Sequence, residues 1–173
     1  LSTGPYEVEN VWLDGQAVFT NNILSGAFRG FGIPQAVFAA ELQIARLAEA
    51  LGMDPVELRM RNLVREGSLT GTMMEVMPNC STRETLEAAA KAAGWVKTSE
   101  VWKRHQTPQE VRPGTLHGVG IASGWKNIGY TLGFQETSTA TIELYGEAEI
   151  ERVVVRLPAA EVGQGIQTTI TQM

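Results

Sequence analysis

The sequence of 173 residues contains a single cysteine, Cys80. A lone thiol excludes a disulfide, a Cys-x-x-Cys redox pair, a four-cysteine zinc site and a thiolate-held iron–sulfur cluster within the chain. It fits a reducing compartment, and we expect a cytoplasmic protein. The two histidines, His105 and His117, lack metal-ligand spacing. Metal binding by protein side chains is therefore not expected.

Long apolar runs and an excess of basic residues are also missing. Arg46 and Glu49 interrupt the longest apolar run, so it falls short of the roughly 20 residues that a membrane-spanning helix needs. Fourteen basic and nineteen acidic residues give a net charge of −5, and the basic ones are scattered. This balance disfavours a surface that tracks nucleic-acid phosphates. We expect neither a membrane span nor a nucleic-acid partner.

Both ends of the sequence lack terminal signals. Residues 1–9 have no initiator Met and no basic-then-apolar order of a signal peptide. Residues 166–173 are typical of the first turns of a helix without a stop signal. We therefore expect the sequence to be a piece of a longer chain.

The apolar pattern predicts a mixed α and β protein: a β-hairpin, then helices, then antiparallel strands. Asp14-Gly15 is typical of a two-residue hairpin turn between strands at residues 6–13 and 17–21. Helical periodicity with start and stop signals predicts three helices, at about residues 34–51, 55–63 and 82–93. Capping boxes are predicted at Asp54 and Ser81.

The second half of the chain changes in composition. Residues 96–115 have little periodicity and are predicted to be a linker, with Val101 and Trp102 as a helical remnant within it. Beyond them, β-forming residues predict strands at 119–121, 137–145 and 150–157, followed by a helix that begins near Ile166.

A first candidate site is the run Gly-Ala-Phe-Arg-Gly-Phe-Gly at residues 26–32, which leads into Pro34 and a helix. The glycines allow the backbone to approach a ligand closely, and Arg29 supplies a permanent positive charge. Loop amides and the positive end of the helix both favour an anion. A strand-to-helix turn whose arginine points to water is equally compatible with the pattern.

A second candidate site is Glu-Val-Gly-Gln-Gly at residues 161–165, before the last predicted helix. The two glycines free the backbone around Gln164, whose amide both donates and accepts hydrogen bonds. Taken alone, this motif is more typical of a turn. The recurrence of two glycine loops, each opening a helix, raises the hypothesis that both converge on one anionic cofactor.

Together with these two loops, further segments carry a family resemblance. The segments are residues 26–35, Glu41, residues 57–63 and residues 161–168. Their order resembles the molybdenum-binding large subunit of the xanthine dehydrogenase and aldehyde oxidase family. The resemblance implies a fragment of a two-subdomain molybdopterin-binding architecture. The implied boundaries are the end of the first subdomain at 1–80, a helix and linker at 81–115, and the start of the second subdomain at 116–173.

The resemblance also implies residue roles. The cofactor-binding residues would be Arg29, Gly30, Gly163, Gln164 and Gly165, with Arg29 near the molybdenum without being a direct ligand. Substrate-binding residues would be Phe31, Tyr130 and Thr131, which place aromatic faces against a planar substrate. The family more often has Phe where Tyr130 stands, and a Tyr there adds a hydroxyl.

By resemblance, the parent protein is an oxidoreductase that hydroxylates a purine, another N-heterocycle or an aldehyde with water as the oxygen source. Its cofactor is molybdopterin, plain or as a cytosine dinucleotide, and its electrons leave through iron–sulfur clusters and FAD in other domains or subunits. The catalytic glutamate of the family lies downstream, so no catalytic residue is expected here, and Glu161 is predicted to be a structural carboxylate. The alternative is a non-catalytic binding or assembly module that keeps the scaffold without the cofactor.

Overall fold

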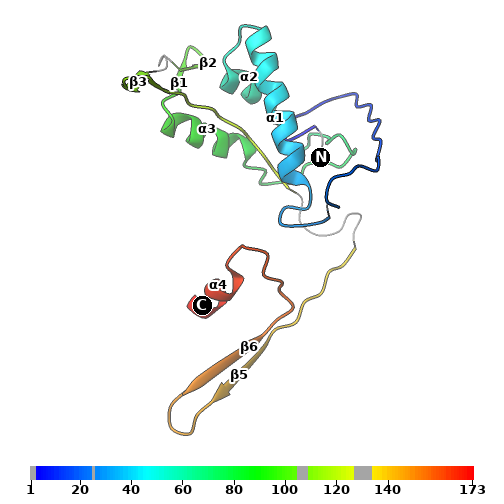
Figure 1. Ribbon diagram of the computed structural model, residues 1–173, viewed down its shortest axis with the longest axis vertical. Helices are drawn as coiled ribbons and strands as arrows, with labels where there is room; N and C mark the ends of the chain where they lie inside the picture. The colour runs from blue at the N-terminus through cyan, green and yellow to red at the C-terminus, as the bar shows by residue number, and fades with distance from the viewer. Residues whose placement is uncertain (1–2, 25, 105–108, 127–133) are drawn as a thin grey trace. The chain divides into compact units, whose positions relative to one another are not determined.

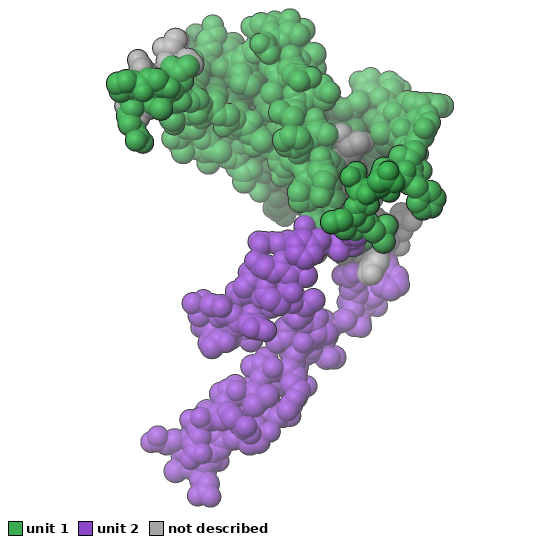
Figure 2. All heavy atoms as spheres, viewed as in Figure 1, with its two compact units in different colours: residues 1–25, 30–126 green, residues 26–29, 127–173 purple. Residues whose placement is uncertain are grey.

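The computed structural model describes residues 3–24, 26–104, 109–126 and 134–173 of the chain. The chain forms two compact units, which Figure 2 colours separately. Unit 1 comprises residues 1–25 and 30–126, and unit 2 comprises residues 26–29 and 127–173. No helix in these described ranges is both long enough and apolar enough to cross a membrane.

Three helices form the body of unit 1: α1 (Ile33–Ala50), α2 (Pro55–Asn62) and α3 (Thr82–Ala92). Their bounds lie close to those predicted from periodicity, so the helical part of the prediction is confirmed (Figure 1). α2 contacts both of the other helices and therefore lies at the centre of the unit.

The two predicted capping boxes have different outcomes. The Asp54 side chain accepts a hydrogen bond of 2.8 Å from the Val56 backbone N–H, which caps α2 as predicted. Ser81 makes no such side-chain bond, because its backbone (φ −97°, ψ 24°) lies outside the extended conformation that this cap requires. Thr82 instead ties the start of α3 to the preceding loop by donating to the Val64 carbonyl.

The region predicted to be a linker contains short antiparallel strands. They are β1 (Val96–Thr98) paired with β2 (Val101–Lys103), and β3 (Gln109–Arg112) paired with β4 (Thr115–His117). The helical-remnant interpretation of Trp102 is wrong, because Trp102 lies buried in β2. The turn between β1 and β2 uses Ser99 and Glu100 at positive φ (48° and 71°), without the Asn or Gly that makes such turns recognisable.

The predicted opening hairpin is wrong. Residues 7–20 form no strand, and Tyr6 makes an isolated antiparallel bridge with Leu63 instead. Trp12 and Phe19 are exposed and pack on nothing that would hold a sheet in place. The Asp14-Gly15 turn signal alone is therefore insufficient to pair the residues on either side of it.

The apolar core of unit 1 forms where α2 meets α3 and the β1–β2 hairpin. Its buried side chains include Val56 and Met60 of α2, Leu86 of α3, and the two tryptophans Trp95 and Trp102. Residues 119–121, predicted to be a strand, form no ladder, but Val119 and Ile121 pack against this core.

A buried ion pair joins α1 to α2. The Arg59 Nε donates to the Glu41 Oε2 at 2.8 Å, and the two side chains are only 1% and 6% exposed. The Tyr6 hydroxyl donates to the other carboxylate oxygen at 2.5 Å, and the Ser123 N–H donates to Oε2 at 2.9 Å. Burial and the bond to Glu41 raise the pKa of the Tyr6 hydroxyl well above its ordinary value. The cluster therefore fastens the first residues, two helices and the 118–126 segment together.

A second buried carboxylate connects α2 to the β1–β2 hairpin. Glu57 accepts from the Arg61 Nε at 2.6 Å and from the Trp102 N–H at 2.9 Å. Desolvation raises the pKa of Glu57, but the bonds from Trp102 and Arg61 outweigh it and hold the pKa below its ordinary value of 4.5.

Unit 2 contains one antiparallel hairpin and one helix. The strands β5 (Thr141–Tyr145) and β6 (Arg152–Arg156) pair with Leu144 opposite Val153, and α4 (Ile166–Gln172) follows. These elements confirm the last two predicted strands and the last predicted helix. An ion pair between Glu143 and Arg156 spans the ladder.

We predict that Arg59→Met lowers the free energy of unfolding by about 3–5 kcal/mol, because it leaves the Glu41 carboxylate buried without its cation. The matched control is Arg46→Met at an exposed arginine of α1, which should cost less than about 1 kcal/mol. Urea unfolding of the purified protein measures both. Equal losses in the two variants would contradict a dominant role for the Glu41–Arg59 pair.

Glu57 generates a pH-dependent prediction. Its lowered pKa contributes stability that is present above pH 4.5 and is lost as the pH falls through the folded-state value. The stability difference between the native protein and Glu57→Gln should therefore shrink between about pH 5 and about pH 3. Urea midpoints measured across this range test it, and a difference independent of pH would refute the assignment.

Candidate functional site

The first part of one glycine loop, residues 26–29, contacts the other glycine loop within unit 2. Arg29 Nη1 donates a hydrogen bond of 2.7 Å to the carbonyl of Gly163, although 134 positions separate them. Residues 26–29 and the 161–165 loop belong to the same compact unit. The predicted convergence of Arg29 with the glutamine-containing loop is therefore present in the fold.

Glu161 organises the second loop. Its Oε1 accepts from the N–H groups of Gly163 (2.8 Å) and Gly165 (3.1 Å), and its Oε2 accepts from the N–H of Ile166 (2.7 Å). These backbone bonds, that of Gly165 first, lower the pKa of Glu161 although desolvation opposes them. Its predicted structural role is confirmed.

The flanking glycines are required by the backbone of this loop. Gly163 and Gly165 have φ values of 92° and 75°, in the left-handed region that L side chains rarely adopt. A Cβ added to Gly165 would meet nothing within 4 Å, so the space beside it is open to a ligand.

Gln164 folds back onto its own loop. Its Oε1 accepts from the Val162 N–H at 2.7 Å, and its Nε2 donates to the Ala160 carbonyl at 2.6 Å. A carboxamide has a second N–H and a second lone pair, so each end keeps one further hydrogen-bonding position. The side chain thus shapes the loop and retains limited capacity for a ligand.

The Gly30-Phe31-Gly32 segment belongs to unit 1 and has an unusual backbone. All three residues have positive φ (89°, 51° and 85°), and Gly32 is the N-cap of α1. A Cβ on Gly30 would lie 2.7 Å from Pro34 Cδ, so only glycine fits there. Phe31 is 71% exposed, and its left-handed backbone costs about 1–2 kcal/mol. The segment holds a phenyl ring at the surface.

The donors around Gly163 suit an anionic group. Arg29 uses one N–H for the Gly163 carbonyl, and a guanidinium has further N–H groups in its fork. Two of the amides that could bind an anion at the start of α4, those of Gly165 and Ile166, are instead bound to the Glu161 carboxylate. An anionic cofactor therefore fits this loop through Arg29, the remaining Gln164 positions and the open side of Gly165.

Two predicted substrate-binding residues and a metal site remain to be considered. Tyr130 and Thr131 fall outside the described residues. Within the described part of the chain, no group of three His, Cys, Asp or Glu side chains could hold a metal ion.

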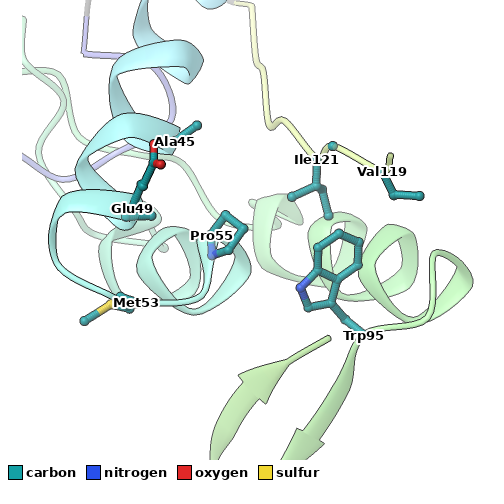
Figure 3. Close-up of a pocket in the computed structure, with 9 residues that line it drawn as sticks. Ala45, Glu49, Met53, Pro55, Trp95, Val119 and Ile121 are labelled. Carbon is teal, nitrogen blue, oxygen red and sulfur yellow. The ribbon is translucent and has the colours of Figure 1, made fainter. Parts of the chain in front are cut away.

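Two hollows lined by described residues of unit 1 are mainly apolar. One of about 390 Å³ lies between the start of α1 and Trp125. The other, of about 310 Å³, lies between the end of α1, Pro55, Trp95 and Ile121, and Figure 3 shows Ile121 facing the Trp95 ring. Neither brings together titratable side chains, so neither offers acid–base chemistry.

Sequence reasoning missed the buried carboxylates of unit 1. Glu41 occupies an apolar-periodic position of α1, and Glu57 and Arg61 have the i, i+4 spacing of a helical ion pair. A charged residue on a predicted buried face is the signal that could have found Glu41.

Comparison with known proteins identifies the family. Residues 1–63 and 88–173 each match a family described as "Molybdopterin cofactor-binding domain". The chain is 46% identical over 99 residues to the nicotinate dehydrogenase large molybdopterin subunit of Eubacterium barkeri, covering 55% of this chain and 23% of the relative. It is 33% identical over 159 residues to the xanthine dehydrogenase molybdenum-binding subunit of Escherichia coli, covering 90% and 19%.

The aldehyde oxidoreductase of Megalodesulfovibrio gigas is 46% identical over 147 residues, covering 84% of this chain and 15% of that protein. A solved aldehyde oxidoreductase structure from Desulfovibrio gigas matches with 43% identity over 39% of this chain and 8% of that one, at a TM-score of 0.33. The chain thus spans less than a quarter of the length of these relatives. With molybdopterin cofactor-binding domains matched along both halves, the chain belongs to the family of xanthine dehydrogenase and aldehyde oxidoreductase large subunits.

Proposed function

We propose that this chain forms part of the molybdopterin-binding surface in the large subunit of a molybdenum hydroxylase. The observation that carries the proposal is the hydrogen bond between Arg29 and Gly163, which joins Arg29 to the second glycine motif within unit 2. The family matches along both halves of the chain support it.

Cofactor binding is assigned to Arg29, Gly30, Gly163, Gln164 and Gly165. The Arg29 guanidinium lies near the metal without ligating it and balances the negative charge of the cofactor. The glycines let the backbone approach the pterin, and the Gln164 carboxamide contributes its remaining N–H and lone pair.

Substrate binding is assigned to Phe31, Tyr130 and Thr131. The exposed Phe31 ring offers an apolar face to a planar molecule. The assignment of Tyr130 and Thr131 rests on the family resemblance alone. The named relatives include a nicotinate dehydrogenase and an aldehyde oxidoreductase, which supports a purine, another N-heterocycle or an aldehyde as the substrate class.

The proposed activity of the parent enzyme is hydroxylation with water as the oxygen source. When bound, the molybdenum cofactor supplies the two-electron oxidation of the substrate carbon. Iron–sulfur clusters and FAD in other domains or subunits carry the electrons away, and the catalytic base lies outside this chain. This chain binds and orients cofactor and substrate, within proposed segments 1–80, 81–115 and 116–173.

Metal analysis of the full-length parent, purified from a host that makes the cofactor, tests the proposal directly. We expect about one molybdenum per large subunit. A well-folded parent without molybdenum would refute the proposal and support the alternative of a non-catalytic assembly module.

Arg29→Ala should lower molybdenum content or turnover of the full-length enzyme by at least about tenfold, because it removes the positive charge beside the cofactor. Arg46→Ala is the matched control, since Arg46 is an exposed arginine of α1 remote from the glycine motifs in sequence. Elemental analysis and steady-state kinetics measure both variants. Wild-type values in Arg29→Ala would remove the assignment.

Phe31→Ala should raise KM for planar substrates by roughly 2–10-fold, the worth of an aromatic contact. Phe38→Ala, an exposed phenylalanine of α1, should leave KM unchanged. Comparing an aromatic with a small aliphatic aldehyde shows whether the loss depends on planarity. Equal kinetics for wild type and Phe31→Ala would exclude ring contact at this position.

A further inference from the structure

Gly163 connects two opposite charges that do not touch each other. Its N–H donates to the Glu161 carboxylate, and its carbonyl accepts from the Arg29 guanidinium. No ion pair within 4.0 Å links Glu161 to Arg29, both of which are described. The carboxylate therefore fixes the residue that orients Arg29 without itself neutralising the arginine charge.

We propose that Glu161 is the positioning residue of the cofactor loop: it holds Gly163 so that its carbonyl aims Arg29, and it occupies the amides at the start of α4. The anionic part of the cofactor is then held by Arg29 and not by those amides. This inference rests on the proposed function, because it concerns how the same loop receives the cofactor.

The Glu161 carboxylate reaches from the loop into the helix that follows it. Its two oxygens accept from Gly163, Gly165 and Ile166, so one side chain fixes the loop and the first residue of α4 together. Because the Gly165 and Ile166 amides at the start of α4 are bound to Glu161, fewer amides of the first turn are left for an external anion.

Gln164 braces the same loop. Its carboxamide bridges the Val162 N–H and the Ala160 carbonyl. Left-handed backbone at Gly163 and Gly165 is thereby held from both sides. A loop restrained in this way keeps the Gly163 carbonyl pointing in one direction. A fixed carbonyl can then orient the long Arg29 side chain through its hydrogen bond.

The Arg29 guanidinium keeps its charge in this arrangement. Arginine donates to the carbonyl through one Nη atom and keeps its remaining N–H groups for a ligand. A direct Glu161–Arg29 pair would have neutralised the guanidinium. Transmission through the Gly163 peptide orients Arg29 and preserves its charge for an anionic group.

The experiment uses the full-length protein and the variants Glu161→Gln and Glu161→Asp, with Glu147→Gln as the control. Glu147 is an exposed glutamate in the β5–β6 turn of the same unit. The first measurement is hydrogen exchange of peptides covering 160–167 in protein produced without cofactor. Glu161→Gln should speed exchange there by at least about tenfold, because a carboxamide has one acceptor oxygen in place of two. Glu161→Asp and Glu147→Gln should change it less.

The second measurement is molybdenum content in a double-mutant cycle with Arg29→Ala. Glu161→Gln should lower occupancy several-fold in the wild-type background and have no further effect when Arg29 is already Ala. Independent, multiplicative losses would overturn a role exerted through Arg29, as would unchanged exchange at 160–167.

Failure of the proposed function gives a different pattern. A wild-type protein without molybdenum refutes cofactor binding, whereas the exchange experiment still reports whether Glu161 fixes the loop. A wild type that loads molybdenum, together with Glu161→Gln that keeps both loop protection and occupancy, overturns the inference alone.

Discussion

The buried pair between Glu41 and Arg59 is the contact on which the order of unit 1 depends. An isolated charge in an apolar interior is strongly disfavoured, so each partner requires the other, and both require the polar groups around them. The carboxylate draws in Tyr6 and the backbone of Ser123, which lie far apart in sequence. One glutamate on α1 thereby holds Tyr6, α2 and the 118–126 segment together within unit 1.

The helices were predictable because their signals are local. Apolar spacing, Pro34 or Pro55 in the first turn and a glycine after the last residue all act within a few residues. The opening hairpin was not, since Asp14-Gly15 favours a turn but does not determine whether the flanking residues pair. The β1–β2 hairpin is the reverse case, because it is present without having been predicted. Ser99 and Glu100 carry no turn signal, and the burial of Trp102 in the core stabilises the two strands.

The residues of the candidate site were predictable from the sequence, but their hydrogen-bond partners were only partly predictable. Glycine placement indicated both loops, and Arg29 does reach the second one. Gln164 was interpreted as a ligand-reading amide, yet in the structure it braces its own loop. Side-chain to backbone bonds two to five residues apart compete with outward-facing roles, and sequence spacing alone cannot decide between them. Glu161 has the same local geometry, and its structural role followed from its position before the loop.

At Phe31 the stability of the fold and the proposed role of the side chain favour different residues. Its left-handed backbone is less strained for glycine or asparagine than for a large side chain. The exposed ring gains little burial that could compensate for this strain. Replacement by either of those residues would relax the loop and strengthen the fold while discarding the aromatic surface. Substitutions at position 31 that stabilise the fold would therefore remove the ring that we propose to contact the substrate.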